Sequence, residues 1–431
     1  MNTNSKPKIK NGFLAYPAAI SLLFYVFFYQ LAYPFSSTLF LYLAFALFVA
    51  WMIVGSKVYL STQMLLMGLV TLVSVLGTFY TNNSEKGNRE AILTAVTLLF
   101  LVVLAQDGTL LCRLKKLIYY FSLVVLIGVV LQFLMSDTMN TVLRSLLRAD
   151  SYEQLMWSYN VDKAYAGFSA YTADAAYFCA TLFGFVFFEK TFRKSVTMRK
   201  KILYYAIMIL SIFCIFLTSK RGIAVALLIA LIIAYIAWKK ISAKTFIRII
   251  LLISLCGAIL YVLYDKNAIV HAFFQRFDPA DGDLTTGRSD IWKEALDGLQ
   301  NEIFGMGTGS AYRIYDTGLH NIYLQLFYDH GIVGAGIYVV FFLYNLRLAI
   351  KRKEPMQIYI QMLMLVYGMS GNPIYSNSFF IVYVIFSVVT VEKRNTECLR
   401  PYENEMAKHQ PFVNANCKEE YYHESGNPNI S

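Results

Sequence analysis

Long apolar runs dominate the chain and are separated by short polar stretches. Residues 11–56 and 355–391 contain no Asp, Glu, Lys or Arg. Each stretch is therefore long enough for two helices of about 20 residues across a hydrocarbon layer of roughly 30 Å. The runs lack the alternation of barrel strands, so the pattern predicts an all-α polytopic membrane protein. The predicted spans are 12–31, 35–55, 58–80, 90–106, 117–135, 164–188, 202–218, 222–238, 249–264, 319–347, 356–371 and 374–391.

The composition agrees with this fold class. Hydrophobic residues make up 57% of the 431 positions, charged residues 15%, and the mean hydropathy is +0.50. These values exclude a soluble, disordered or collagen-like chain. We expect one polytopic membrane domain over 1–391 and a disordered cytoplasmic tail over 392–431, which is polar and has no apolar period. The six cysteines form no C-x-x-C pair, so we expect no disulfide framework and no zinc site.

The distribution of basic residues predicts the orientation in the membrane. A net charge of +11 could indicate a nucleic-acid partner, but the basic residues are scattered between apolar runs, so we expect none. With twelve spans, 26 Lys and Arg fall on the side of the termini and 12 on the other side. The positive-inside rule therefore predicts cytoplasmic termini. A signal peptide at the N-terminus is the weaker interpretation, because the apolar stretch is long and lacks a clear cleavage site.

Two segments on the extracytoplasmic side are longer than simple turns. Residues 136–163 have apolar positions at helical spacing, which suits a short amphipathic helix at the membrane surface. Residues 265–318 form one large extracytoplasmic loop of 54 residues, and a loop of this length is usually functional. We expect a helix near 290–302, capped by Ser289 or Asp290.

Lys220 and Arg221 lie between two apolar runs that leave room for a turn of only about four residues. They could simply extend to the interface as flanking residues. Cations at a membrane edge are costly and usually have a partner, so an anion site is the alternative that we favour. Gly222 would allow a ligand to approach the backbone closely.

Arg288 precedes the helix predicted in the large loop. A helix N-terminus and an adjacent arginine suit phosphate oxygens, although a surface salt bridge to one of nine loop carboxylates is the alternative. The glycine run 304–310 follows a helix rather than a strand, which disfavours a dinucleotide site. We expect instead a flexible turn against the membrane or a substrate.

His320 stands at the start of the tenth predicted span. An imidazole there could act as a general base near neutral pH, although an isolated histidine is more often a hydrogen-bonded interface residue. His330 and His271 have weaker claims. Asp281 and Asp283 resemble the metal-binding pair of nucleotide-sugar glycosyltransferases, but such sugars are not found outside the cell, and we expect no metal.

Together, these motifs resemble the O-antigen ligase and polysaccharide polymerase family of the bacterial envelope. The order along the chain agrees as well as the motifs. The matching motifs are Thr218-Ser219-Lys220-Arg221-Gly222, Gly287-Arg288 with Ile291-Trp292, Phe304-Gly305-Met306-Gly307, and His320-Asn321 with Tyr323-Leu324-Gln325. The chain departs from the family where Lys220 replaces a small residue. It also departs where Tyr171-Thr172-Ala173-Asp174 replaces a Pro-Asn-like helix start, which puts substrate contacts near the sixth helix in doubt.

The resemblance implies a multi-helix glycosyltransferase of the GT-C type in the bacterial cytoplasmic membrane. Its donor would be an undecaprenyl-diphosphate-linked oligosaccharide, and no metal or cofactor would be needed. Arg221 and Arg288 would bind the diphosphate and stabilise its charge, while His320 would deprotonate the acceptor hydroxyl. The substrate-binding residues would be Lys220, Gly222, Gly287, Trp292, Gly305, Gly307, Asn321 and Tyr323.

Three functions remain open on the sequence alone. We favour polymerisation of lipid-linked repeat units into capsular polysaccharide, exopolysaccharide or O-antigen, with a chain-length regulator and a flippase as partners. Ligation to a lipid or cell-wall acceptor uses the same bond exchange. A flippase or transporter would share the twelve-span plan, but no internal repeat is evident and the main hydrophilic insert is extracytoplasmic.

Overall fold

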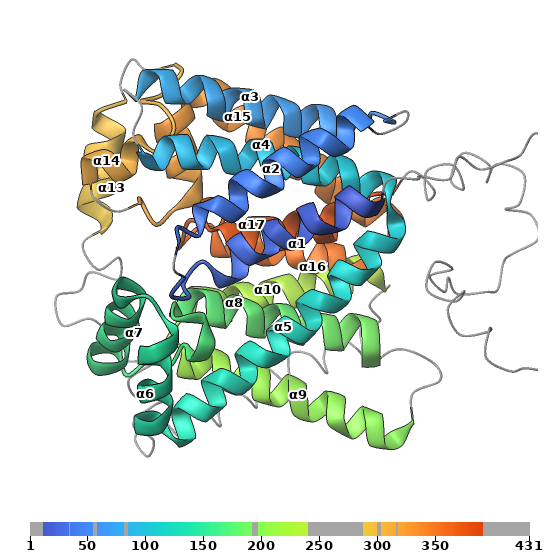
Figure 1. Ribbon diagram of the computed structural model, residues 1–431, viewed down its shortest axis with the longest axis vertical. Coiled ribbons are helices and arrows are strands. Elements are labelled where there is room, and N and C mark those ends of the chain that lie inside the picture. The colour runs from blue at the N-terminus through green and yellow to red at the C-terminus, as the bar shows by residue number, and fades with distance from the viewer. Residues whose placement is uncertain are drawn as a thin grey trace, which may run out of the picture.

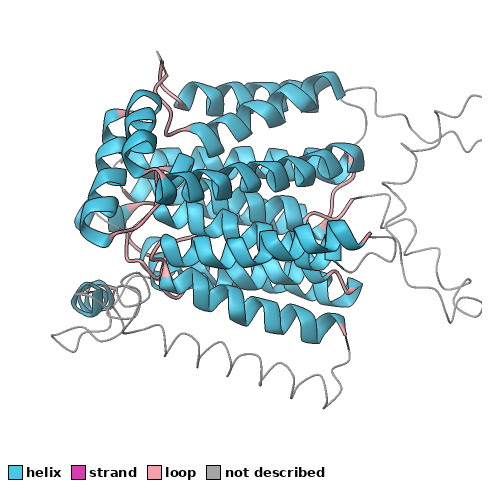
Figure 2. Cartoon of the chain, turned by 90° about the horizontal axis from the view of Figure 1, so that it is seen from below, coloured by secondary structure: helices cyan, strands magenta, loops and turns pink. Residues whose placement is uncertain are grey.

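The computed structural model describes residues 12–33, 35–54, 58–81, 85–191, 197–239, 288–299, 303–315 and 318–390. Over these residues the chain is helical, and its single isolated β-bridge joins Leu31 to Leu147. The long helices lie roughly parallel or antiparallel to one another, whereas the short helices α6, α7, α13 and α14 run in other directions (Figures 1 and 2). They are α1 (Gly12–Phe28), α2 (Thr38–Val54), α3 (Thr62–Tyr80), α4 (Glu85–Gln106), α5 (Gly108–Leu134), α6 (Ser136–Leu146), α7 (Ala149–Asp162), α8 (Thr172–Phe185), α9 (Met198–Leu217), α10 (Arg221–Trp238), α13 (Arg288–Asp297), α14 (Ser310–Tyr315), α15 (Ile322–Arg352), α16 (Pro355–Tyr367) and α17 (Asn377–Ser387).

Seven helices in the described part of the chain are long and apolar enough to cross a membrane. They are α3, α4, α5, α8 with the π-helical turn that follows it, α9, α10 and α15. Helices α1, α2 and α17 are also apolar but shorter. The prediction of an all-α polytopic membrane protein is therefore confirmed. The count of twelve spans stays a prediction, and the predicted span 249–264 and the tail 392–431 lie outside the described residues.

Two helices begin at other residues than the predicted spans, because capping and packing decide where a helix begins. Helix α5 begins at Gly108 rather than 117, because Asp107 caps it by accepting a hydrogen bond of 2.9 Å from the Leu110 N–H. Helix α8 begins at Thr172 rather than 164. Before it, Gly167 adopts φ +56° and lies directly against the backbone of α5. A helix through this position would push the chain away from α5.

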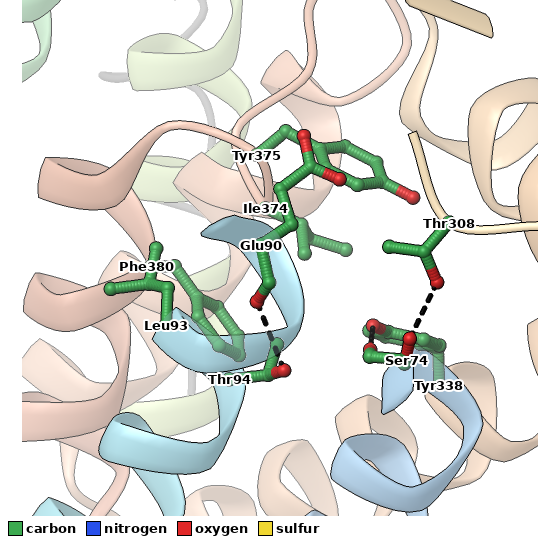
Figure 3. A pocket seen from close by; sticks show the side chains of 9 residues that line it. All are labelled: Ser74, Glu90, Leu93, Thr94, Thr308, Tyr338, Ile374, Tyr375 and Phe380. Carbon is green, nitrogen blue, oxygen red and sulfur yellow. Dashed lines mark hydrogen bonds between the residues drawn. The ribbon is translucent and has the colours of Figure 1, made fainter. Parts of the chain in front are cut away.

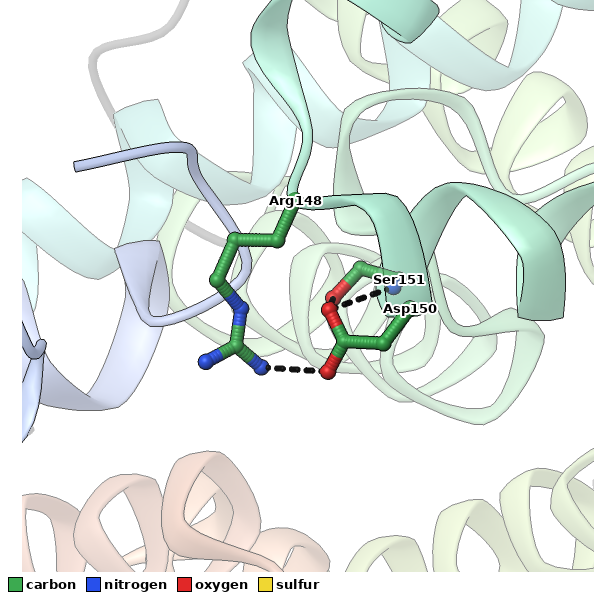
Figure 4. Close-up of polar contacts among 3 residues, drawn as sticks. All are labelled: Arg148, Asp150 and Ser151. Atoms are coloured by element: carbon green, nitrogen blue, oxygen red, sulfur yellow. Dashed lines mark hydrogen bonds and ion pairs between the residues drawn. The ribbon is translucent and has the colours of Figure 1, made fainter. Parts of the chain in front are cut away.

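The segment 136–163 forms two helices, α6 and α7, rather than the single short helix predicted. Arg148 lies between them in an extended conformation, and its N–H donates to the Gln30 carbonyl at 3.0 Å. This bond fixes the junction to the end of α1 and therefore interrupts the helix. The Arg148 side chain forms an exposed ion pair of 2.9 Å with Asp150 in the first turn of α7 (Figure 4).

Helices α6, α7, α13 and α14 lie at the same end of the bundle (Figure 1). Helix α10 packs on α16 and α8, while α15 packs on α3 and α16. The starts of α10 and α15 both lie at the end of α16, since Gly222 packs against Ser370 and the Ile322 N–H donates to the Gly368 carbonyl. Segments far apart in the sequence meet there, and they carry most of the residues for which the sequence predicts chemistry.

Candidate active site

The turn between α9 and α10 is as tight as the sequence predicts. Thr218 ends α9, Ser219 adopts φ +56°, and Lys220 precedes the first residue of α10, Arg221. Gly222 packs closely against the Ser370 side chain, which a Cβ atom would overlap. This glycine therefore permits the approach of the segment that follows α16, and its predicted contact with substrate is not needed to explain it.

Arg288 is the first described residue of α13 and is partly buried. One turn later, the Trp292 indole N–H donates to the Leu319 carbonyl at 2.7 Å. This bond connects the helix of Arg288 to the residue before His320, and it shows what the indole N–H of Trp292 contacts. The helix begins at Arg288, so the predicted capping by Ser289 or Asp290 was wrong. Both residues lie in the first turn, and Gly287 lies outside the described residues.

His320 lies in a turn that is held on both sides. The residue adopts φ +52°, and the preceding Leu319 N–H donates to Gln325 Oε1 at 2.8 Å. Asn321 caps α15 by accepting the backbone N–H of Tyr323 and Leu324 at 3.0 and 3.2 Å. The Tyr323 hydroxyl donates to the Leu365 carbonyl at 2.7 Å. In this structure, the polar groups of Asn321 and Tyr323 therefore fix the start of α15.

A buried polar network lies beneath this turn, and the sequence analysis did not predict it. Gln325 Nε2 donates to Asp329 at 3.1 Å, and both side chains are fully buried. Asp329 also accepts from Ser310 at 3.0 Å and from Tyr375 at 2.9 Å. The network connects α14, α15 and the segment before α17. Two polar residues four positions apart on an apolar helix were the signal that could have predicted it.

Three predicted site residues interact electrostatically: the charges of Arg288 and Lys220 both act on His320. Loss of hydration, the Arg288 guanidinium and the Lys220 ammonium lower the pKa of His320 to about 4, in that order of importance. Burial also lowers the pKa of Arg288. The His320 side chain is nevertheless exposed at the surface, where a substrate could reach it. The result is a neutral imidazole at pH 7 within a positive field, which suits a base beside an anionic ligand.

Residues 206–339 match the family model described as O-antigen ligase. This region is similar to O-antigen ligases. It contains Lys220, Arg221, Arg288 and His320, and we call it the ligase region. No curated protein matches the chain at a significant level. The resemblance that the motifs indicate is confirmed over this region, and the members of the family that it matches are glycosyl-transferring enzymes.

The glycine run of the ligase region is docked on the bundle rather than being a flexible turn. Gly305 and Gly307 adopt φ +75° and +95°. The Gly307 N–H donates to the Asp329 carbonyl at 2.8 Å, next to the break of α15 at Gly331. Thr308 then donates to the Ser74 carbonyl of α3 at 2.7 Å, at the edge of a cavity of about 10 Å³ (Figure 3). Backbone packing alone accounts for both glycines, so we do not include them in the proposed substrate site.

Replacement of Gly305 by alanine is expected to destabilise the protein. An added Cβ would lie 2.7 Å from the backbone nitrogen of His330, and the left-handed backbone conformation disfavours any L side chain. We expect the free energy of unfolding to fall by at least ~2 kcal/mol. The matched control is Gly336→Ala in α15, where a Cβ would meet open space. It should be neutral or stabilising by up to ~1 kcal/mol. Thermal unfolding in detergent measures both, and equal midpoints would contradict the docked loop.

The structure does not bear on the predicted absence of a metal. Asp281, Asp283 and His271 lie outside the described residues. Among the described residues, no cluster of three or more His, Cys, Asp or Glu side chains is arranged to hold a metal ion. His330 is buried in α15, where its ring stacks on Tyr338 with centroids 5.4 Å apart. Its Nε2 lies 3.4 Å from the Tyr375 hydroxyl, so His330 borders the buried network of Asp329.

Proposed function

We propose that the protein polymerises undecaprenyl-diphosphate-linked oligosaccharide repeat units at the outer face of the bacterial cytoplasmic membrane. The observation that carries this proposal is that the charges of Lys220 and Arg288 both act on His320, while the Trp292–Leu319 hydrogen bond holds the helix of Arg288 against the turn of His320. Two cations suit an anionic leaving group, and a neutral imidazole suits a hydroxyl nucleophile. The match of the ligase region to a glycan-transferring family supports the same reaction class.

The geometry supports a single displacement at the anomeric carbon of the donor. Arg221 and Arg288 bind the diphosphate oxygens through paired N–H donors, and Lys220 adds a third positive charge. His320 accepts the proton of the acceptor hydroxyl as the acceptor oxygen forms the new glycosidic bond. The bond between the anomeric carbon and the diphosphate breaks, and undecaprenyl diphosphate leaves with inversion at that carbon. The three cations stabilise the charge on the leaving group, and we expect the reaction to be independent of metals.

Ligation is the second candidate, and the family match favours it equally. It would use the same donor, cations and base, and would differ only in the acceptor, a lipid core or a cell-wall polymer. In either case Arg221 and Arg288 bind the donor, and His320 activates the nucleophile. The acceptor therefore has to be identified by experiment.

A reconstituted assay tests the proposal. Purified protein in liposomes would receive its lipid-linked repeat unit, and the products would be separated by size. Lipid-linked oligomers of increasing length support polymerisation. Transfer to an added lipid core or cell-wall polymer without lengthening supports ligation. Relocation of the substrate across the bilayer with no new glycosidic bond would refute both and support a flippase.

We also propose twelve membrane spans, a GT-C-type arrangement and cytoplasmic termini. Ser289 and Thr197 are both exposed, at the start of α13 and immediately before α9. In a cysteine-free background, Ser289→Cys should react with a membrane-impermeant thiol reagent in intact cells, whereas Thr197→Cys should react only after permeabilisation. Both should react in permeabilised cells, which is the control. The reverse pattern would contradict the proposed orientation.

A further inference from the structure

A buried carboxylate lies near the proposed donor site without a role in the reaction described above. Asp174, in the first turn of α8, is 7% exposed. Its two oxygens accept hydrogen bonds from Gln30 Nε2 at 3.2 Å and from Ser378 Oγ at 3.3 Å. Among the described residues, no Lys, Arg or His forms an ion pair with it. A buried carboxylate that has only neutral donors is costly, and such groups concentrate at functional sites.

Packing relates Asp174 to the turn that carries Arg221. The Tyr367 ring, at the end of α16, lies 5.6 Å from the Phe379 ring, centroid to centroid, and Phe379 follows the Ser378 that donates to Asp174. Tyr367 also lies beside Gly222, the neighbour of Arg221. On the other side, the rings of Tyr171 and Tyr29 stack with centroids 6.0 Å apart, and Tyr29 precedes the Gln30 that donates to Asp174. Asp174 therefore lies between an aromatic pair and the segment that packs on the α9–α10 turn.

The partners of Asp174 limit what it can bind. They are the neutral groups of Gln30 and Ser378, and no cation pairs with it among the described residues, so the site does not suit a diphosphate. A sugar hydroxyl can both donate and accept a hydrogen bond and therefore matches a carboxyl group. The amide of Gln30 and the rings of Tyr171 and Tyr29 are further groups that suit a sugar, which has both polar edges and apolar faces.

We propose that Asp174, Gln30 and Tyr171 form the acceptor-sugar subsite, in which the Asp174 carboxylate accepts a hydrogen bond from a hydroxyl of the incoming pyranose. This inference rests on the proposed function and adds where the acceptor is held. The subsite lies at the end of α1 and the start of α8, across Tyr367 from the turn of Arg221. Asp174 is a positioning residue for the acceptor, and His320 remains the base.

The variant Asp174→Asn tests this subsite. Asparagine keeps the volume and one acceptor oxygen, and the Gln30 amide can rotate to pair with its new N–H group, so the fold should be preserved. The acceptor probe is the repeat-unit oligosaccharide released from its lipid by mild acid, and the donor probe is undecaprenyl diphosphate. Loss of a hydrogen bond to a charged group should raise the acceptor KM about 10- to 100-fold. The affinity for undecaprenyl diphosphate and the thermal midpoint should not change.

The matched control is Asp137→Asn, which removes the same charge from an exposed side chain in the first turn of α6, at the same end of the bundle (Figure 1). It should leave the acceptor KM unchanged, because solvent screens an exposed charge. An equal rise in both variants would overturn the subsite and indicate a general charge effect. A loss of diphosphate affinity or thermal stability in Asp174→Asn would also overturn it. If Asp174→Asn has an unchanged acceptor KM while the wild type transfers glycan normally, only the subsite is refuted. If the wild type transfers no glycan, the proposed function itself is refuted.

Discussion

Replacement of Arg288 by alanine is expected to reduce glycan transfer by at least about 10²- to 10³-fold, the range typical for loss of one group that stabilises transition-state charge. Arg288 is partly buried and lies in the same electrostatic environment as Lys220 and His320. Its paired N–H donors suit a diphosphate, and the negative charge on that group grows as the glycosidic bond breaks. The measurement is the rate of chain extension in liposomes at equal amounts of protein.

Two further variants make the Arg288 result specific. Arg288→Lys should restore little activity, because lysine keeps the charge but loses the planar arrangement of donors. Lys293→Ala removes one positive charge from the exposed face of the same helix and should leave the rate unchanged. Full activity of Arg288→Lys would mean that only bulk charge matters. Normal activity of Arg288→Ala would remove this residue from the site.

Replacement of His320 by alanine should reduce the rate of transfer about 10²- to 10⁴-fold, the usual contribution of a general base. Donor binding should persist, because Arg221 and Arg288 supply the contacts with the diphosphate. The measurement pairs the single-turnover rate with the binding of undecaprenyl diphosphate. A variant with a normal rate, or one that no longer binds this lipid, would show that His320 is not the base.

The pH dependence of the wild-type protein gives a second test of His320. The neutral imidazole is the active form, so kcat/KM should fall as the pH drops through the pKa of about 4 in the free protein. A bound diphosphate offsets the charges of Arg288 and Lys220, which raises the pKa of His320 in the complex. The profile of kcat should therefore fall at a higher pH than that of kcat/KM. This account would be contradicted if kcat and kcat/KM fell at the same pH, or if the same pH dependence were seen in His320→Ala.

Membrane helices are unusually predictable from sequence because every backbone polar group in lipid must be bonded within its own segment. Eleven of the twelve predicted spans coincide with described helices, with boundaries that differ by several residues. The tight turn before Arg221 was also predictable, because the two apolar runs leave little chain between them. The start of α8 was not predictable, because it depends on the contact of Gly167 with α5.

The candidate site, like the fold, was predictable from the sequence only in part. The sequence alone identified Arg221, Arg288 and His320 as polar groups in positions where apolar residues or a simple turn would suffice. The roles of Trp292 and Gly305 could not be read from it, because their partners are backbone atoms of Leu319 and of the residues around His330. Sequence spacing carries no information about contacts with a distant backbone.

The sequence by itself determined that the chain is a helical membrane protein, because hydropathy is a local property. Its motifs also resemble those of O-antigen ligases, and that resemblance is the basis for proposing Arg221, Arg288 and His320 as site residues. Only the tertiary structure decided that Lys220, Arg288 and His320 share one electrostatic environment. It also placed Tyr367 between the segment of Asp174's partner Ser378 and the turn before Arg221, since its ring packs on Phe379 and lies beside Gly222. Burial and charge interactions depend on distances in space, and residues 100 positions apart acquire those distances only when the helices pack.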